Sequence, residues 1–449
     1  MSGVAVLLLT AIAALVPVQT APGQIDAASG DPVAVLAEAR AAVERAPAEF
    51  APALALARAL ATLGRTADAL AAFSRARELA PAGVGGDAVA SAYLVPALLL
   101  RDLDRTGEAI RLLENGTNGR LGSADVYEQL ALLRLADGLV DGAMAAIDAA
   151  LAENLESPGL DLARGLALAR HPNRRGEALD YLKRALKDGV GDPVVIRLEA
   201  AEILSADGRY AEAIEHLRAA EELAPSEPEV IYRLGRALAA AGDREAAQSA
   251  LERHRSLQGA LQRAAEIERA ASADLAAGLS EVQDLAAAGD LEAALEVLLG
   301  LGGRPEDPLV ADAHSLRAKV LFSMRRVDEA AASIAEARRL APHRVEHHYL
   351  EGVFLHTGGY PEDAESALER AVALDPDLGE AHALLGVIAA ETGRPTEAAE
   401  RIERALELGL DRNAPLRFNY ARVLEALGRS EEAKVQMEAF ERLRADGPP

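Results

Sequence analysis

Small, apolar and polar residues recur along this chain with a period of about 34 residues. The segments 50–82, 194–226 and 345–377 share one frame, with a small residue in a first apolar stretch, then a glycine, then an alanine in a second apolar stretch. The glycine ends the first helix in a left-handed conformation, and a proline stops the second helix in the best-preserved copies. The pattern predicts an all-α fold built from helix–turn–helix units.

Two positions of the frame are occupied almost without exception by small residues. Position 8 is Ala57, Ala97, Ala131, Ala201, Gly235, Ala318, Gly352, Gly386 and Ala421. Position 20 is Ala69, Ala109, Ala143, Ala178, Ala213, Ala247, Ala294, Ala330, Ala364, Ala398 and Ala433. Small side chains let two helix backbones approach closely, so these positions predict where the paired helices touch.

This pattern resembles the tetratricopeptide repeat family. The resemblance covers Phe50 to about Arg444 and implies about eleven repeats that stack into a right-handed α-solenoid. The repeats start near residues 50, 90, 124, 159, 194, 228, 275, 311, 345, 379 and 414. In the fourth repeat, position 8 falls near Gly165 and its alignment is open by one residue.

A break in the period divides the predicted solenoid into two sub-arrays. The segment 244–277 holds no proline and one glycine, Gly259, and its apolar residues recur at helical spacing. We therefore expect array 1 over residues 50–257, a connecting long helix over 258–274 and array 2 over 275–444. Residues 22–49 are expected to form a linker and a capping helix, and 445–449 a C-terminal tail.

The first 21 residues have the character of a signal peptide. The apolar run Val4–Val18 has the length of a signal h-region, and small residues near Thr20 and Ala21 suit cleavage, although a basic n-region is missing. We expect a periplasmic or secreted protein. Two alternatives stay open: an uncleaved N-terminal membrane anchor, and a cytoplasmic protein whose apolar N-terminus packs on the first repeat.

Composition excludes several classes of function. The net charge of −24 disfavours nucleic acid as a partner, because such binding neutralises phosphates with basic residues. The absence of Cys excludes disulfides, thiolate metal sites and a Cys nucleophile. The Ala-, Arg- and Gly-rich composition suggests a bacterial genome of high GC content.

Catalytic motifs are scarce. The run from His343 to His347 matches H-x-x-E-H, an inverted zinc-protease signature, which requires both His on one helix face. Because His343 directly follows Pro342, the two are not expected to share a helix face. We expect no catalytic, metal-binding or cofactor-binding residue and no cofactor.

The resemblance places ligand contacts on the concave face, at positions 2, 5, 9 and 12 of the first helix of each repeat. Carried over to this chain, the candidate groove is Tyr232, Arg236, Lys319, Phe322, Tyr349, His356, Phe418 and Arg422. Aromatic and Arg side chains are common interface anchors. The alternative is that these side chains pack against neighbouring repeats.

These observations favour a non-enzymatic scaffold that binds a partner peptide or helix in its groove, in the bacterial cell envelope. A cytoplasmic assembly or regulatory subunit is the alternative. Asn419 lacks the Lys partners of the family's carboxylate clamp, which disfavours docking to a chaperone tail.

Overall fold

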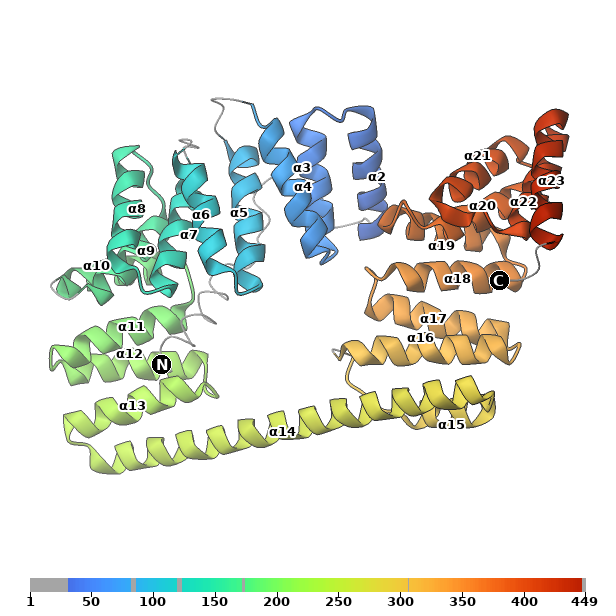
Figure 1. Cartoon of the computed structure of the whole chain (residues 1–449). Coiled ribbons are helices and arrows are strands. Elements are labelled where there is room, and N and C mark those ends of the chain that lie inside the picture. Colours follow the sequence, from blue (N-terminus) through green and yellow to red (C-terminus); the bar gives the residue numbers. More distant parts are fainter. Residues whose placement is uncertain (1–30, 82–85, 119–122, 172–173, 306, 446–449) are drawn as a thin grey trace. The chain divides into compact units, whose positions relative to one another are not determined.

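The computed structural model describes residues 31–81, 86–118, 123–171, 174–305 and 307–445. In these ranges the chain forms helices throughout and no strand, as Figure 1 shows. The all-α prediction is therefore confirmed.

Successive helices pair into eleven antiparallel hairpins, each made of a helix A and a helix B. Their bounds are α3 (Phe50–Thr62) with α4 (Thr66–Leu79), α5 (Asp87–Asp102) with α6 (Thr106–Asn118), α7 (Ala124–Ala136) with α8 (Val140–Ala152), α9 (Pro158–Arg170) with α10 (Arg175–Asp188), α11 (Pro193–Ala206) with α12 (Tyr210–Leu223), α13 (Pro228–Ala241) with the start of α14 (Arg244–Ala288), the end of α14 with α15 (Leu291–Gly300), α16 (Pro308–Ser323) with α17 (Val327–Leu340), α18 (Val345–Thr357) with α19 (Pro361–Leu374), α20 (Gly379–Glu391) with α21 (Pro395–Ala405), and α22 (Ala414–Ala426) with α23 (Ser430–Ala445). A short π-helix, η1 (Leu406–Leu410), follows α21.

A left-handed residue ends helix A in nearly every hairpin. Gly208 has φ of 74°, and a side chain added there would meet nothing within 4 Å, so only the backbone conformation favours Gly. Asp104 and Arg325 hold the same position in their repeats and keep positive φ values of 59° and 63°. The turn geometry is thus imposed by the hairpin even where the sequence does not supply Gly.

The two helices of a hairpin meet at the small residues predicted for this contact. The position-20 alanines from Ala69 to Ala433 are all buried. A Cβ on Gly352 would lie 2.5 Å from Leu368 Cγ and 3.2 Å from the carbonyl oxygen of Ala364, and Gly386 faces Ile402 in the same way. A Cβ on Gly165 would lie 3.1 Å from Leu182 Cδ2, which identifies Gly165 as the position-8 residue of the fourth repeat. Close packing of this kind leaves no room for a larger side chain.

The first turn of helix B carries a repeated ion pair. Arg209, the N-cap residue of α12, donates to both carboxylate oxygens of Glu212 at 2.7 and 2.6 Å. The same pair forms from Arg105 to Glu108, from Arg326 to Glu329 and from Arg429 to Glu432. The Glu in the first turn of helix B, where the helix dipole favours negative charge, therefore also binds the Arg before it.

The chain divides into two compact units, with the main boundary within α14, between Glu266 and Ile267, and with residues 31–46 and 59–65 grouped in unit 2. Unit 1 contains most of the first six hairpins, and one continuous apolar core runs through it from Val89 to Ala250. Unit 2 contains the later hairpins, with three separate core clusters. The expected array boundaries stay predictions.

The N-terminal helix α2 (Pro32–Arg45) forms where the linker and capping helix were expected and buries Val33, Leu36 and Ala39. It is grouped with unit 2, in which it contacts α19, and not with the repeats that follow it in sequence. Its role as a cap for array 1 stays a prediction.

The long helix α14 extends further than the sequence predicted. It has 45 residues and ends at Ala288, so helix A of the seventh repeat is the end of the same helix. Gly278 does not break it, because this glycine lies inside the helix and provides the space that Leu301 fills. Gly278 is therefore a close-packing position inside α14 and does not end the helix.

Replacing Ala213 with Leu should lower the free energy of unfolding by about 1–3 kcal/mol, because Ala213 is fully buried between α11 and α12. Thermal and urea unfolding of the full chain measure the effect. Ala211→Leu, at an exposed position of the same helix, is the control and should be nearly neutral. A neutral result at Ala213 would contradict the assignment of position 20 to the helix contact.

Candidate functional site on the helix A surfaces

The eight predicted groove residues all lie on helices A, but they fall in both units. Tyr232 and Arg236 lie on α13 in unit 1. The other six lie in unit 2: Lys319 and Phe322 on α16, Tyr349 and His356 on α18, and Phe418 and Arg422 on α22. Each unit therefore has its own candidate surface.

The unit 1 surface combines an aromatic ring, a guanidinium and a pocket. Tyr232 is 37% exposed, and the guanidinium carbon of Arg236 lies 5.9 Å from its ring centre. A pocket of about 230 Å³ opens beside Arg236. Its lining residues, from α11, α12 and α13, are Ala201, Glu202, Ser205, Ala206, Tyr210, Leu217, Arg233, Arg236, Ala237 and Ala240.

Of the two arginines that line this pocket, Arg233 forms an ion pair within the fold and Arg236 is exposed. Arg233 donates to Glu229 at 2.6 Å, and its side chain is 12% exposed. Arg236 is exposed and lies over the Tyr232 ring. Arg236 is thus the cation of this surface that is accessible to an incoming group.

In unit 2, several predicted groove residues bind the next repeat. Lys319 donates to Glu346 at 2.5 Å, joining α16 to α18. His356 Nε2 lies 2.9 Å from Glu391 of α20, and the Phe322 ring stacks on Phe354 with centroids 4.5 Å apart. These contacts support the alternative that sequence analysis left open, since the side chains hold successive helices A together.

The last repeat of each predicted array has a bulky residue at position 27. In eight of the other nine repeats this position is small and buried: Ala76, Gly116, Ala150, Ala185, Ala220, Ala337, Ala371 and Ala405. In the sixth repeat it is His254, 5.2 Å from the Tyr232 ring, and in the eleventh it is Phe440, 5.2 Å from Phe418. Only the seventh repeat also departs, with Leu301 packed on Gly278. Because His254 and Phe440 pack on Tyr232 and Phe418, these two groove candidates are partly used for packing.

Sequence reasoning missed Glu128, which lies at groove position 5 of the third repeat. Its carboxylate fills the space where a side chain on Gly159 would project. Burial, with a smaller contribution from Asp125, raises the pKa of Glu128 to about 7. Its position in the frame was the signal that could have identified it.

The histidines near residue 343 do not converge. His343 is exposed and precedes the N-cap residue Arg344, whereas His347 is buried inside α18. In the part of the chain that the structure describes, no group of three or more His, Asp or Glu is placed to hold a metal ion.

Two other buried histidines join consecutive repeats. His348 is 1% exposed, and its Nε2 lies 2.9 Å from the carbonyl oxygen of Pro342, which precedes α18. His382 forms the same contact with Pro376 at 3.0 Å. A carbonyl accepts only from a protonated nitrogen, so both rings carry hydrogen on Nε2. Burial lowers the pKa of both imidazoles.

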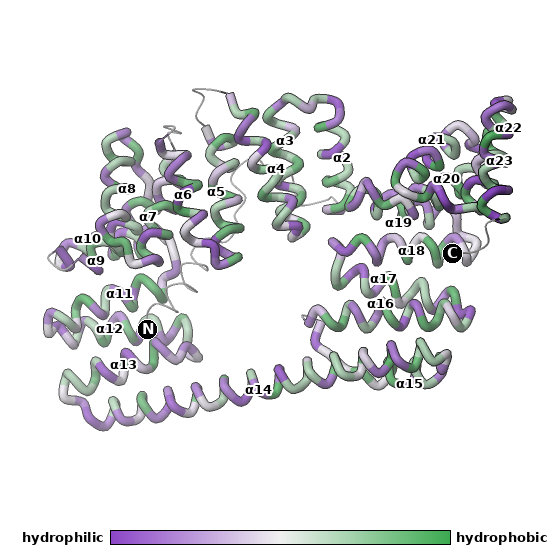
Figure 2. The backbone as a smooth tube through the Cα atoms, in the orientation of Figure 1, coloured by the Kyte–Doolittle hydropathy of each residue, from purple (hydrophilic) through white to green (hydrophobic). Residues whose placement is uncertain are grey.

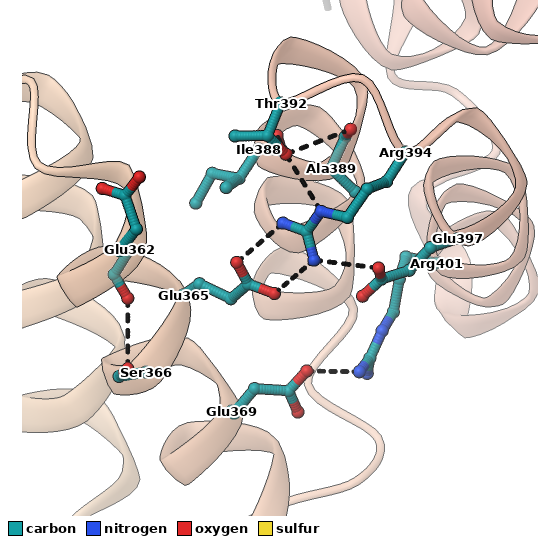
Figure 3. Close-up of polar contacts among 10 residues, drawn as sticks. All are labelled: Glu362, Glu365, Ser366, Glu369, Ile388, Ala389, Thr392, Arg394, Glu397 and Arg401. Carbon is teal, nitrogen blue, oxygen red and sulfur yellow. Dashed lines mark hydrogen bonds and ion pairs between the residues drawn. The ribbon is translucent and has the colours of Figure 1, made fainter.

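A cluster of charged residues between α19 and α21 is also used within the fold (Figure 3). Arg394 donates to both oxygens of Glu365 at 2.7 Å and to Glu397 at 2.9 Å. Arg401 donates to Glu369. The hydrogen bond from Arg394 lowers the pKa of Glu365, and burial raises the pKa of Glu369. Because these carboxylates bind arginines of the next repeat, the cluster joins repeats.

Family comparisons agree with this architecture. A tetratricopeptide repeat model matches residues 162–228, 279–345, 315–379, 357–415 and 384–448, which is more than half of the chain, and a second matches 204–258. The chain belongs to the tetratricopeptide repeat family. Its repeat fold is that of a protein-interaction scaffold.

Several solved structures match a part of this chain. MamA from MSR-1 is 18% identical, covers 39% of this chain and 99% of its own, and has a TM-score of 0.34. MamA from AMB-1 is 20% identical, with 38% and 96% coverage and a TM-score of 0.33. The first tetratricopeptide domain of Spaghetti (RPAP3), bound to an HSP90 peptide, is 21% identical, with 28% and 99% coverage and a TM-score of 0.27. No curated protein matches the chain in sequence.

The expected signal segment, residues 1–21, lies outside the described residues. Within the described ranges, none of the helices combines the length and the apolar character that a bilayer crossing requires.

Acidification should destabilise unit 2 through His348 and His382. Their pKa values are lowered in the folded state relative to about 6.5 in the unfolded chain, so the unfolded chain binds more protons as the pH falls below that value. The free energy of unfolding should therefore fall between pH 7 and pH 5. Thermal unfolding across this range measures it.

The double variant His348→Gln and His382→Gln keeps a donor for each proline carbonyl and cannot titrate. Its melting temperature should fall less than that of the unmodified protein over the same pH range. An equal fall in both proteins would contradict the assignment of acid sensitivity to these two rings.

Proposed function

We propose that this protein is a non-enzymatic scaffold that binds a peptide or helix of a partner protein on its helix A surface. The observation that carries the proposal is the pocket beside Arg236 in unit 1, with Tyr232 exposed on the same helix. Aromatic and Arg side chains beside a concave site are frequent hot spots of protein interfaces.

The chemistry of the pocket suits an extended segment with mixed side chains. Ala201, Ala206, Ala237 and Ala240 offer small apolar surfaces, whereas Glu202, Ser205 and Arg236 offer both signs of charge and a hydroxyl. Recognition of a peptide by a helical groove needs this combination of apolar contact and fixed polar partners.

The charged groups support a binding role over an enzymatic one. Glu365, Glu346 and His356 are hydrogen-bonded to residues of adjacent repeats. Acid–base catalysis requires titratable groups that converge on a substrate. The residues lining the unit 1 pocket combine small apolar surfaces with an exposed guanidinium, so binding is the function that this surface supports best.

Replacing Tyr232 with Ala and Arg236 with Glu should reduce partner capture from the native host by about tenfold or more, as for hot-spot residues. Quantitative mass spectrometry of affinity-captured proteins is the measurement. Arg218→Glu, at an exposed site on helix B of the fifth repeat, is the matched control and should capture the same set. Unchanged capture by the Tyr232 and Arg236 variant, at unchanged melting temperature, would overturn the groove assignment.

Lys319 is a poorer choice for such a test. Reversing its charge would break the hydrogen bond to Glu346 and place like charges at the contact between α16 and α18. A loss of binding would then mix with a loss of stability.

For location, we propose export to the periplasm or the cell envelope, with a cytoplasmic assembly or regulatory subunit as the alternative. The support is the apolar run Val4–Val18 followed by small residues at Thr20 and Ala21. Exported protein purified from the native host should have an intact mass that lacks about the first 21 residues.

A full-length mass in the soluble fraction would overturn the export proposal and favour the cytoplasmic alternative. A full-length mass in the membrane fraction would instead indicate an uncleaved anchor.

A further inference from the structure

The ninth repeat differs from the other ten at the end of its helix B, α19. Position 29 of this repeat is Ala373, which is 8% exposed. In the other ten repeats position 29 is exposed, and in six of them it is charged: Glu78, Lys187, Glu222, Arg339, Glu407 and Arg442. The next residue, Leu374, is fully buried, whereas Leu223 at the same position of the fifth repeat is 54% exposed. The end of α19 is therefore an apolar surface that is covered, and its sequence suits the cover.

The N-terminal helix α2 lies against this end of α19, and both helices belong to unit 2. Arg40 of α2 donates to the carbonyl oxygen of Leu374 at 3.3 Å. Arg65, which is grouped in the same unit, donates to the same oxygen. Leu374 is the last residue of α19, and arginines stabilise the carboxyl end of a helix because it carries partial negative charge.

The N-terminus of α2 adds an ion pair to this contact. Asp31 is the N-cap residue of α2, and its side chain accepts from the Val33 backbone N–H at 3.0 Å. The other carboxylate oxygen lies 3.0 Å from Nε of Arg370 on α19. Asp31 and Arg40 thus give α2 two separate polar contacts with α19.

Between these two contacts α2 turns an apolar face inward. Val33, Leu36 and Ala39 recur every three residues and are 2%, 0% and 6% exposed. Hydrophobic and hydrophilic residues are both present along α2, as Figure 2 shows. A helix of 14 residues is marginally stable by itself in water, so α2 depends on packing to stay helical.

We infer that the end of α19, formed by Arg370, Ala373 and Leu374 and here called the α19 end, is a second interaction surface. In this structure α2 occupies it, and a partner helix of the same chemistry binds there by displacing α2. That helix carries a carboxylate at its N-cap, apolar residues every three positions and a basic residue beside the third of them. Docking of an amphipathic helix by its apolar face is a common mode of recognition.

Exchange of the two helices is feasible because the polar contact at the N-terminus of α2 is weak. The side chains of Asp31 and Arg370 are 37% and 39% exposed, in either order, and exposed ion pairs contribute little to stability. The α19 end lies on a helix B in unit 2, whereas the pocket beside Arg236 lies in unit 1. The inference and the proposed function can therefore fail separately.

The variant Ala373→Arg of the full chain tests whether α2 depends on the α19 end. It introduces a charged residue of the kind that six other repeats carry at this position, so it should release α2 and leave the ninth repeat folded. Trypsin cleavage after Arg40, followed by mass spectrometry, should become about tenfold faster or more, because release of α2 exposes its backbone. Glu407→Arg, at the exposed position 29 of the tenth repeat, is the matched control and should be cleaved like the unmodified chain.

A fluorescent peptide with the sequence of residues 31–46 takes the place of the partner helix in a second test. Leu36→Asp in the full chain disables its own α2. The peptide should bind this variant about tenfold or more tightly than it binds the unmodified chain, in which a docked α2 leaves few sites free. Ala37→Asp, at an exposed position of the same helix, is the matched control and should bind the peptide as weakly as the unmodified chain. Fluorescence anisotropy is the measurement.

A charge exchange tests the position of the bound peptide. A peptide with Asp31→Arg should bind the chain with Leu36→Asp and Arg370→Asp more tightly than the chain with Leu36→Asp alone. The comparison uses one peptide throughout, so the loss of its N-cap residue affects both measurements equally.

Unchanged cleavage at Arg40 in folded Ala373→Arg protein would overturn the inference. So would equal peptide binding by the unmodified chain and the Leu36→Asp variant, or no binding by either. Peptide binding that is lost when Tyr232→Ala and Arg236→Glu are introduced would place the peptide in the unit 1 pocket. That outcome would overturn the α19 end as its site while supporting the proposed function.

Discussion

The contact between helix A and helix B at their small residues governs every hairpin in this protein. Alanine at position 20 is buried throughout, and position 8 is glycine or alanine in every repeat but the seventh, where it is the buried Val282. In the ninth repeat the space above Gly352 is filled by Leu368, so a large residue of helix B packs into the gap left by a small residue of helix A. This packing fixes the distance between the two helices of a hairpin. It thereby decides which helix faces contact the adjacent repeats.

Stacking adds a second constraint at position 27. In eight of the nine repeats that another repeat follows within an array, this position is Ala or Gly and is buried, because the next helix A must approach it; the seventh repeat, with Leu301, is the exception. His254 and Phe440 are too large for that role, and they pack on Tyr232 and Phe418 instead. His254 thus contacts Tyr232 beside the pocket proposed to bind a partner, and Phe440 contacts the groove candidate Phe418.

Part of the acidic charge of the chain is paired with arginines placed one turn or one repeat away. Arg209 binds Glu212 within a hairpin, while Arg394 binds Glu365 across two repeats. Exposed pairs of this type contribute little stability each, but those between repeats also fix register. Among the groove candidates, Arg236 and Arg422 are basic side chains that are exposed on the described helix A surfaces.

The sequence by itself determined the repeat phase, the helix contacts and the turns, because these depend on residues close together in one hairpin. Ala213 and Gly208 could be assigned roles from spacing alone, and the family followed from the same pattern. The roles of Lys319, Phe322 and His356 could not, since each depends on a side chain that a different repeat supplies. Only the tertiary structure decided that these three bind neighbouring helices, that Glu128 fills the space above Gly159, and that α14 continues through Gly278 to Ala288. The physical reason is that periodicity records contacts within a repeat, whereas the free or occupied state of a side chain is decided by packing between repeats.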